Sequence, residues 1–561
     1  MQATHGANPR GSRGLFNPVN HDFKCVEGPL SDAGGGHAAR SRRRPGRTKL
    51  CPHATRALKT LRYTNPILPG FYPDPSICRV GGDYYLVTSS FEYFPGVPIF
   101  HSRDLVNWRQ VGHCLTRAGQ LPLEKAGASR GIFAPTIRYH DGLFYMVTTN
   151  VTNGGNFFVT AKDPTGEWSE PVWLDQEGID PSLLFDDDGK VYLTTNKNRQ
   201  SIIDPTTGKR LSEVRTTWAG TSGFEMEAPH LYRINGRYYL IVAEGGTSRG
   251  HMVTVARADN PWGPFESCPH NPILTHRDVH IDSIEATGHA DLIRAHNGSW
   301  WMVFLGIREL PGPFPQVHNL GRETFLAPVT WTDDGWPVVN RTGTVALEME
   351  GDLPALHPWP DEPARDDFDR PRLQFCWNFL RNPYEGDWSL TERPGWLRLK
   401  GSAVTLDDTD SPACVLRRQQ HHACEASALL EFTPAHVNER AGLTVLMNPT
   451  HHYDLAVTTR DGQRWVELHQ RIGELHAVTA RDVVPAGAIT LGVTADTGYY
   501  SFWYDAGDAH RKHLGRGTVR HLSTEVAGGF TGVYLGLFAT GDGKRSTAEA
   551  DFDWFEYQPI M

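Results

Sequence analysis

The sequence predicts an all-β protein in which a five-bladed β-propeller is followed by a β-sandwich. Three observations lead to this prediction: a turn and aromatic-rich strand that recur five times, short alternating strands in the last third, and a strand-favouring composition. The chain contains 59 Phe, Trp and Tyr residues and 39 Pro residues against 8 Met residues. At 561 residues it is too long for one hydrophobic core, so we expect two folded domains and an appendage.

The repeat lies between about residues 70 and 305 and marks the first domain. In each copy a turn glycine precedes a strand rich in aromatic and aliphatic residues. The turn glycines are Gly82, Gly142, Gly189, Gly236 and Gly298. Their spacings of 60, 47, 47 and 62 residues suit one four-stranded sheet per copy, and five radial sheets make a five-bladed propeller. A long β-sandwich with coincidental hairpins is the alternative.

A second recurring motif begins the strand before each turn and carries the ionisable candidates. The position eight or nine residues before the turn glycine holds Asp74, Asp180, Glu227 and His289 in four copies. Because equivalent positions of a radial array converge on one axis, we expect these side chains at one mouth of the central channel. Asp74 or Asp180 alone could be a turn or capping residue. Three acids at one repeat position argue for function, because clustered carboxylates repel and desolvate one another.

Carboxylates that face each other across an aromatic-lined pocket are what glycoside hydrolysis requires. One acid protonates the leaving oxygen, and a second carboxylate activates water or attacks the sugar. A third carboxylate can hold the acid in place and keep it protonated by like-charge repulsion. The chain contains no phosphate-cradling loop, no HExxH and no GxSxG motif that would favour another chemistry.

The motifs around these residues resemble those of glycoside hydrolase family 43. They are NPILPGFYPDPS (65–76), FEYFPGV (91–97), GIDPS (178–182), EAPHLY (227–232), GHAD (288–291) and LGRETF (320–325). The likeness runs from about residue 63 to the C-terminus. It is strongest to the β-xylosidases and α-L-arabinofuranosidases that carry a C-terminal β-sandwich, a concanavalin-like jelly roll.

The resemblance implies a role for each acidic candidate. Asp74 matches the general base that activates water, Glu227 matches the general acid, and Asp180 matches the carboxylate that tunes and orients the acid. Glu225 is the rival acid, but the family places its acid directly before a (Gly/Ala)-Pro-His element. The family inverts the anomeric configuration, so the carboxyl groups of Asp74 and Glu227 should lie about 6.5–9.5 Å apart.

The resemblance also implies substrate-binding residues outside the acids. Arg322 matches a substrate-binding arginine, with a surface salt bridge as the alternative. Phe91 matches the aromatic wall of the sugar pocket, with a core position as the alternative. Phe133 stands where relatives often carry Trp, so less area is available for stacking on a sugar. Phe530 matches an aromatic residue that the second domain lends to the active-site mouth, with a plain exposed loop as the alternative.

His289 matches an axial histidine that in many relatives faces calcium or water. We expect that no cofactor is required and leave open a calcium ion in the channel with His289 as metal ligand, because one imidazole is a weak ligand for a hard cation.

The sequence divides into four parts. Residues 1–60 carry 11 Lys and Arg against 3 Asp and Glu, so we expect a disordered basic extension rather than a nucleic-acid or targeting segment. Residues 61–345 form the predicted propeller and residues 346–365, which are rich in Pro, Asp and Glu, a linker. Residues 366–561 form the predicted β-sandwich.

Charge, hydropathy and cysteine spacing narrow the function classes. The net charge of −9 argues against a nucleic-acid partner. No apolar run approaches the roughly 18 residues of a membrane span, so no membrane partner is expected. The eight cysteines are dispersed without a CxxC pair and predict a cytoplasmic protein. We expect the pairs His421-His422 and His451-His452 at the surface rather than as ligands, because neighbours on a strand point to opposite faces.

We therefore predict an inverting, exo-acting glycoside hydrolase that releases xylose from the non-reducing ends of β-1,4-xylo-oligosaccharides. The alternative is an α-L-arabinofuranosidase that acts on arabinoxylan or arabinan side chains, or one enzyme with both activities. A carbohydrate-binding protein without catalysis and a scaffold protein are rivals from other classes. The expected partner is a xylo-oligosaccharide or an arabinoxylan-derived substrate, and a homo-oligomer is left open.

Overall fold

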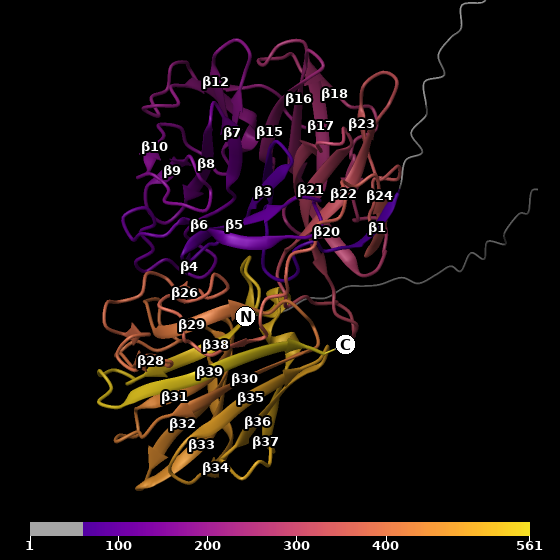
Figure 1. Ribbon diagram of the computed structural model, residues 1–561. Helices are drawn as coiled ribbons and strands as arrows, with labels where there is room; N and C mark the ends of the chain where they lie inside the picture. The colour runs from indigo at the N-terminus through magenta and orange to yellow at the C-terminus, as the bar shows by residue number, and fades with distance from the viewer. Residues whose placement is uncertain (1–59, 561) are drawn as a thin grey trace, which may run out of the picture. The chain divides into compact units, whose positions relative to one another are not determined.

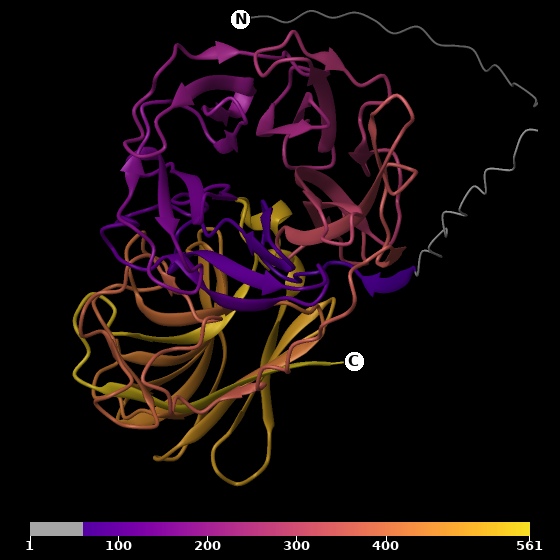
Figure 2. The same ribbon diagram turned by 45° about the horizontal axis from the view of Figure 1, so that its top comes forward.

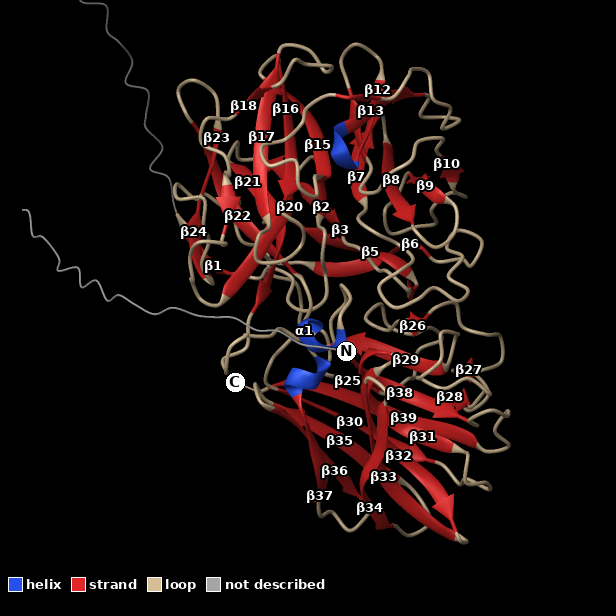
Figure 3. Ribbon diagram, turned by 180° about the vertical axis from the view of Figure 1, so that it is seen from behind, coloured by secondary structure: helices blue, strands red, loops and turns tan. Residues whose placement is uncertain are grey.

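The computed structural model describes residues 60–560, whose regular secondary structure consists almost entirely of antiparallel strands (Figure 1). The predicted basic extension, apart from its last residue, lies outside the described residues. The helices of the described chain are the short segments η1 (Asn196–Asn198), η2 (Val519–Leu522) and α1 (Thr524–Ala527) (Figure 3). None of its helices has the length and apolar character needed to cross a membrane.

The N-terminal domain contains five antiparallel sheets of four or five strands, and each is formed by strands that lie close together in the sequence. In Figure 2 these sheets are arranged around a common centre. The first sheet contains β2 (Ser76–Val80), β3 (Asp83–Val87), β5 (Gly96–Ser102) and β6 (Arg109–Leu115), and the second contains β7 (Thr136–His140), β8 (Leu143–Asn150), β9 (Gly155–Ala161) and β10 (Val172–Trp173). The third contains β11 (Ser182–Phe185), β12 (Val191–Thr195), β13 (Arg199–Ile203) and β14 (Arg215–Thr216).

The remaining two sheets of this domain contain longer strands. The fourth is β15 (Glu227–Ile234), β16 (Arg237–Glu244), β17 (Met252–Ala258) and β18 (Glu266–Ser267), with β19 (Leu274–Thr275) also paired to β17, and the fifth is β20 (Ile284–Arg294), β21 (Trp300–Arg308), β22 (Glu323–Trp331) and β23 (Pro337–Val339). A separate pair joins β1 (Leu61–Thr64) to β24 (Glu348–Gly351), so a strand occurs inside the range for which the sequence indicates a linker. Each predicted turn glycine lies at the turn between the first two strands of its sheet, as the hairpin pattern indicates.

Two larger antiparallel sheets form the C-terminal domain. One contains β27 (Trp388–Ser389), β28 (Leu397–Lys400), β39 (Glu549–Pro559), β30 (Cys424–Glu431), β35 (Ile489–Ala495), β36 (Tyr499–Asp505) and β37 (Lys512–Thr518), with β25 (Arg365–Asp366) paired to β39. The other contains β29 (Ala413–Arg418), β38 (Tyr534–Thr540), β31 (Arg440–Asn448), β32 (His451–Arg460), β33 (Gln463–Ile472) and β34 (Leu475–Val483). Alternate residues of the two sheets form one shared hydrophobic core, as a β-sandwich requires.

Both faces of β32 in this second sheet are buried, which corrects one sequence prediction. His451 and His452 are buried rather than at the surface. They point to opposite faces as expected, but both faces of β32 are covered. His452 lies 2.7 Å from Asp407 and 3.0 Å from Asp454; burial opposes its charge, but these carboxylates outweigh burial and raise the pKa of His452 to about 9. It is therefore a charged structural residue.

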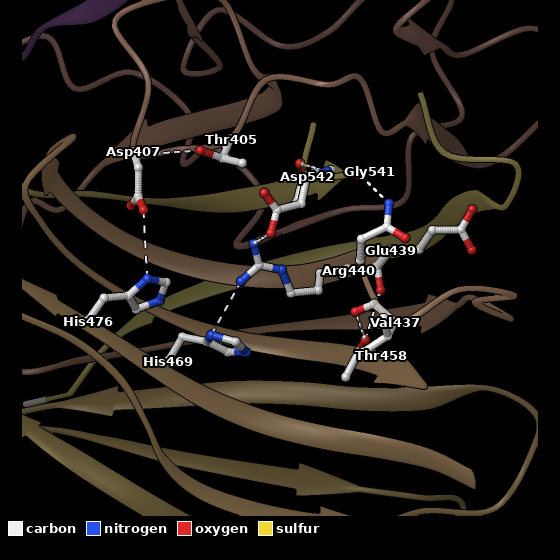
Figure 4. A network of polar contacts seen from close by, with 12 residues as sticks. Thr405, Asp407, Val437, Glu439, Arg440, Thr458, His469, His476, Gly541 and Asp542 are labelled. Carbon is white, nitrogen blue, oxygen red and sulfur yellow. Dashed lines mark hydrogen bonds and ion pairs between the residues drawn. The ribbon is translucent and has the colours of Figure 1, made fainter. Parts of the chain in front are cut away.

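Further charged groups follow the same face of this sheet (Figure 4). Arg440 donates to Asp542 at 3.0 Å and lies 3.3 Å from Nδ1 of His469. His476 lies 3.7 Å from Asp407. These pairs explain how polar side chains are accommodated under the loops that cover β31–β33.

An aromatic cluster joins the two domains. Phe71, Phe91 and Tyr93 of the N-terminal domain share one buried cluster with Leu446 and Tyr534 of the C-terminal domain. The rings of Tyr93 and Tyr534 are stacked with centroids 4.0 Å apart. In addition, β4 (Tyr93–Phe94) pairs with β26 (Phe379–Leu380). The contact between the domains thus resembles a protein interior rather than a wet, polar interface.

Arg418 is the cation at the centre of this contact. It is 2% exposed, and its Nε donates to the carbonyl oxygen of Phe71 at 2.6 Å. Its Nη1 donates to Oδ1 of Asn378 at 2.7 Å, and its guanidinium carbon lies 4.6 Å from the centroid of the Tyr72 ring. Charge-assisted hydrogen bonds in a buried site are among the stronger polar contacts.

We predict that Arg418→Met destabilises the protein, because it leaves the Phe71 carbonyl oxygen buried without a partner. Loss of hydrogen bonds to a charged group costs about 1.5–3 kcal/mol each, which corresponds to a fall in Tm of about 4–10 °C in a chain of this size. Thermal unfolding measures the effect. Arg103→Met is the control, since the exposed Arg103 pairs with Asp83 at the surface and its loss should change Tm by less than about 1 °C. Equal Tm values for both variants would contradict the proposed contribution of Arg418 to stability.

Candidate active site

One cavity of about 230 Å³ brings together all eight site residues that the sequence predicts. It is lined by Asp74, Phe91, Phe133, Ala134, Ile179, Asp180, Glu225, Glu227, Gly246, Thr247, His251, His289, Arg322 and Phe530. The N-terminal domain supplies every lining residue except Phe530. The convergence predicted from the repeat position is therefore found in the structure.

The acidic residues reach this cavity because they stand where the first strand of a sheet begins. Asp74 and Asp180 each lie two residues before such a strand, β2 and β11, and Glu227 is the first residue of β15. Asp74 and Asp180 share a left-handed backbone, with φ of 55° and 53°. Such a conformation is unfavourable for a residue with a Cβ atom and is often found at functional sites. The two repeats thus use the same local geometry to turn a carboxylate inward.

Irregular strand pairing directs the side chains of the other two repeats. The register of β15 against β16 shifts between Glu227 and His230. The register of β20 against β21 shifts twice between Glu285 and Asp291, the stretch that contains His289. Bulges of this kind re-aim side chains and are common beside active sites.

Asp74 is held as a carboxylate. Its Oδ1 accepts a hydrogen bond from Nη1 of Arg322 at 2.7 Å, and its Oδ2 accepts one from the Ser89 hydroxyl at 2.5 Å. Nδ1 of His289 lies 3.5 Å from Oδ1. Burial acts to raise the pKa of Asp74, but Arg322, His289 and Ser89 outweigh it, so the pKa lies below its usual value. At neutral pH this group is an anion.

Glu227 and Asp180 are in the opposite electrostatic situation. Burial, followed by the charges of Asp74 and Glu225, raises the pKa of Glu227 to about 7. Burial and then the charges of Glu227 and Asp74 raise the pKa of Asp180 well above its usual value. Because the two carboxyl groups titrate as one buried pair, we conclude that the pair holds at least one proton near neutral pH.

Asp180 also fixes the backbone beside Glu227. Its Oδ2 accepts a hydrogen bond from the N–H of Ala228 at 3.2 Å, one residue after Glu227. Within residues 60–560 the Glu227 carboxyl group itself has no hydrogen-bonding partner, so its proton is available to a ligand. Glu225 also lines the cavity but is exposed to solvent, whereas Glu227 is partly buried.

Arg322 lies between two aromatic rings. Its guanidinium carbon is 5.6 Å from the ring centroid of Phe91 and 5.6 Å from that of Phe530. Arg322 is 7% exposed, which rules out the alternative of a surface salt bridge. In the described residues its buried Nε has no hydrogen-bonding partner, so one donor remains for a ligand. Phe91 agrees with both the expected wall position and the alternative core position, because it lines the cavity and is only 2% exposed.

The side chains around His289 supply few of the oxygen ligands that calcium takes. Calcium is bound by six to eight oxygen ligands, whereas the nearest oxygen of Asp74 is already occupied by the Arg322 cation. Among residues 60–560 no group of three or more His, Cys, Asp and Glu side chains is arranged to hold a metal. Burial lowers the pKa of His289, which therefore stands beside Asp74 as a neutral imidazole.

Three lining or supporting residues were not found from the sequence. Ser89 lies in the loop after β3, and Thr247 and His251 lie between β16 and β17, so none occupies the recurrent position before a turn glycine. His251 is buried, and its Nδ1 lies 3.1 Å from the carbonyl oxygen of Ala286. No pattern in a single sequence distinguishes these residues from other loop residues.

The comparisons with known proteins define the class of this protein, a glycoside hydrolase. Residues 63–337 match the family described as "Glycosyl hydrolases family 43", and residues 365–558 match the "Beta xylosidase C-terminal Concanavalin A-like domain". The chain belongs to glycoside hydrolase family 43, and its C-terminal domain is concanavalin A-like.

Similar proteins match over nearly their whole length. The chain is 46% identical over 513 residues to the "Non-reducing end alpha-L-arabinofuranosidase BoGH43B" of Bacteroides ovatus, covering 90% of this chain and 95% of that protein. It is 40% identical over 518 residues to a "Xylosidase/arabinosidase" of Butyrivibrio fibrisolvens, covering 88% and 99%. The solved structure "Bacteroides ovatus Xyloglucan PUL GH43B" matches with a TM-score of 0.86 and 44% identity, covering 89% and 100%.

Gly288 is required beside His251, and this yields a prediction. A Cβ atom at position 288 would lie 2.2–2.4 Å from three ring atoms of His251. We predict that Gly288→Ala displaces the ring and lowers Tm by about 3–8 °C, as overpacking by one methyl group costs about 1–3 kcal/mol. In a His251→Ala background the same substitution should cost less than about 2 °C. Gly82→Ala is the control, because no atom lies within 4 Å of its Cβ position. A full loss of stability in the His251→Ala background would contradict the proposed clash.

Proposed function

We propose that the protein hydrolyses terminal pentosides with inversion, using Asp74 as general base and Glu227 as general acid. The observation that carries this proposal is the pair of opposite charge states in one cavity: the pKa of Asp74 is lowered and that of Glu227 is raised to about 7. An inverting glycosidase needs one ionised and one protonated carboxyl group at neutral pH.

The reaction follows from these charge states. Asp74 accepts a proton from a water molecule while the water oxygen forms a bond to the anomeric carbon. The glycosidic C–O bond breaks at the same time, and Glu227 gives its proton to the departing oxygen. Asp180 holds the backbone next to Glu227 through Ala228 and disfavours loss of the Glu227 proton. The products are a free sugar with inverted configuration and the shortened glycan.

The substrate-binding roles are part of the same proposal. Arg322 can donate its unpaired Nε–H to a sugar hydroxyl. Its hydrogen bond to Oδ1 holds the carboxylate of Asp74, the base, in position. Phe91 and Phe133, whose centroids lie 5.2 Å apart, offer aromatic surface to a sugar ring. Phe530 adds a third ring from the C-terminal domain. The neutral imidazole of His289 lines the cavity beside the base and is assigned to substrate binding.

We infer that each of the five sheets of the N-terminal domain is one blade of a five-bladed propeller. The support is that each of the five sheets contributes a lining residue to one cavity from its first strand or from the residues just before that strand. The domain limits, the cytoplasmic location, the disordered extension and the oligomeric state stay predictions.

We propose xylose as the released sugar, from the non-reducing ends of β-1,4-xylo-oligosaccharides, with L-arabinofuranose as the second candidate. The name of the Butyrivibrio relative joins both activities, and that of the Bacteroides relative favours arabinose. The cavity that holds the acids has a volume of about 230 Å³, and we take it as the place of the one terminal unit that is removed. An adjoining cavity of about 420 Å³ shares Thr247, Arg322 and Phe530 with it.

The substrate is tested with 4-nitrophenyl β-D-xylopyranoside and 4-nitrophenyl α-L-arabinofuranoside, each compared with its natural oligosaccharide. We expect release of single pentoses, and polarimetry or NMR should show the inverted anomer first. Equal release from internal and terminal linkages would contradict the exo action. Absence of hydrolysis of both glycosides and both oligosaccharides would contradict the proposed function.

The acid assignment predicts that Glu227→Gln lowers kcat for unactivated oligosaccharides by about 10²–10⁴-fold, because general acid catalysis contributes a factor of this size. Binding should remain, since Gln has nearly the same shape. Glu225→Gln is the matched control and should retain activity. Titration calorimetry with xylose or arabinose measures binding of both variants. Loss of turnover in Glu225→Gln but not in Glu227→Gln would reverse the assignment.

The pKa values also predict the pH dependence. Since Glu227 acts in its protonated form, kcat/KM should fall as pH rises through about 7. Since Asp74 acts in its ionised form and its pKa is lowered, the acidic limb should lie below the usual titration range of an aspartate. Glu225→Gln removes a charge that raises the pKa of Glu227, so its basic limb should move to lower pH. The profile requires an oligosaccharide substrate, because an aryl leaving group needs little protonation. An unmoved basic limb would contradict this coupling.

A further inference from the structure

At its tip, the loop that carries Phe530 is hydrogen-bonded to Ser129 of the N-terminal domain. The N–H of Phe530 donates to the hydroxyl oxygen of Ser129 at 2.8 Å across 401 residues of chain. At Gly529, which has a φ of 89°, a Cβ atom would lie only 2.5 Å from the same oxygen. The loop therefore approaches Ser129 so closely that position 529 has no room for a side chain.

Ser129 is itself fixed by a buried group. It is 5% exposed and has a φ of 58°, an unfavourable conformation that its surroundings must maintain. Its N–H donates to Oε2 of Glu92 at 3.0 Å, and Glu92 is 1% exposed. Glu92 directly follows Phe91, and its carbonyl oxygen accepts a hydrogen bond from the N–H of Arg381 at 2.8 Å. Ser129 is thus hydrogen-bonded to the segment that carries Phe91, the aromatic wall of the cavity.

Both ends of this loop are also held, since Glu525 accepts a hydrogen bond from the N–H of His318 at 2.9 Å and the N–H of Val533 donates to the carbonyl oxygen of Asn319 at 2.9 Å. Between these two points, Ser129 is the contact next to the ring. Gly528 and Gly529 have φ values of 73° and 89°, so the backbone there loses much conformational freedom when it is ordered. Phe530 remains 42% exposed, although its ring lies 6.3 Å from that of Phe91 and covers the Arg322 guanidinium. Because the Phe530 ring is half-exposed and follows two glycines, a further contact is needed to hold it over the cavity.

We propose that Ser129 is a positioning residue whose hydroxyl holds the Phe530 loop of the C-terminal domain over the sugar-binding cavity. The proposal rests on the proposed function, because it takes the ligand of the cavity to be a terminal pentose. Ser129 does not line the cavity and acts only through Phe530. Its loss should weaken binding of the sugar more than it slows bond cleavage, because the Phe530 ring lines the cavity but carries no group that can transfer a proton.

The first experiment compares kinetics of the full-length protein with those of Ser129→Ala on a 4-nitrophenyl pentoside. We expect kcat/KM to fall about three- to tenfold, mainly through a higher KM, which corresponds to the loss of one hydrogen bond. In a Phe530→Ala background, Ser129→Ala should change kcat/KM by less than twofold. Equal losses in both backgrounds, or a fall in kcat without a change in KM, would overturn the positioning role.

The matched control is Ser169→Ala. The Ser169 hydroxyl accepts a hydrogen bond from the N–H of Thr160 at 3.0 Å, the same type of contact, but Ser169 does not line the cavity. It should leave KM and kcat unchanged. A rise in KM equal to that of Ser129→Ala would show that the loss of any such contact is sufficient, and would overturn the proposal.

Hydrogen exchange provides a readout that does not depend on activity. The amide of Phe530 should exchange faster in Ser129→Ala than in the unmodified protein, while peptides of the β31 and β38 core strands should not change. Unchanged exchange at Phe530 would overturn the proposal even if the protein is an active pentosidase. Faster exchange in a protein that cleaves no pentoside would support the loop contact and refute the proposed function.

Discussion

The buried ion pair of Asp74 and Arg322 is the interaction on which the catalytic cavity depends. Its two residues come from the first and the last sheet of the N-terminal domain and are 248 residues apart. Ion pairs of this kind lose hydration when they are buried and need not stabilise a fold. Here the pair keeps Asp74 ionised in an environment that would otherwise protonate it. The Phe91 and Phe530 rings exclude water from the guanidinium and so strengthen the field it exerts on its partner.

In the same cavity the carboxyl groups of Glu227 and Asp180 hold at least one proton, because no cation of the described chain is paired with them. Arg322 is the largest of the groups that lower the pKa of Asp74, whereas for Glu227 and Asp180 its effect is smaller than that of the neighbouring acids that raise the pKa. The difference arises from which side chain the arginine fork contacts. One arginine therefore divides three similar acids into an ionised group and a proton-bearing pair, and acid–base hydrolysis needs both.

The fold and the acids were predictable because they recur, and the remaining features were not because they occur once. The spacing of the turn glycines indicated the five sheets, and the shared repeat position of Asp74, Asp180, Glu227 and His289 indicated that they converge. Ser89 and His251 lie in loops without a counterpart in other repeats. The alternation of His451 and His452 indicated opposite faces correctly, but no local pattern shows that a loop containing Asp407 covers the outer face of that sheet. Contacts between distant loops, such as that of Ser129 with Phe530, depend on tertiary packing alone.

The aromatic cluster shared by the two domains has a consequence for protein engineering. Because Phe71 and Tyr93 pack directly on Leu446 and Tyr534, the concanavalin A-like unit is not an interchangeable module. In a hybrid that takes this unit from a relative, the side chains at the contact between the domains would not fit one another. They would fit only if the cluster residues of both domains were transferred together. Substrate preference in such hybrids would then change with the quality of the graft as well as with the residues that surround the sugar.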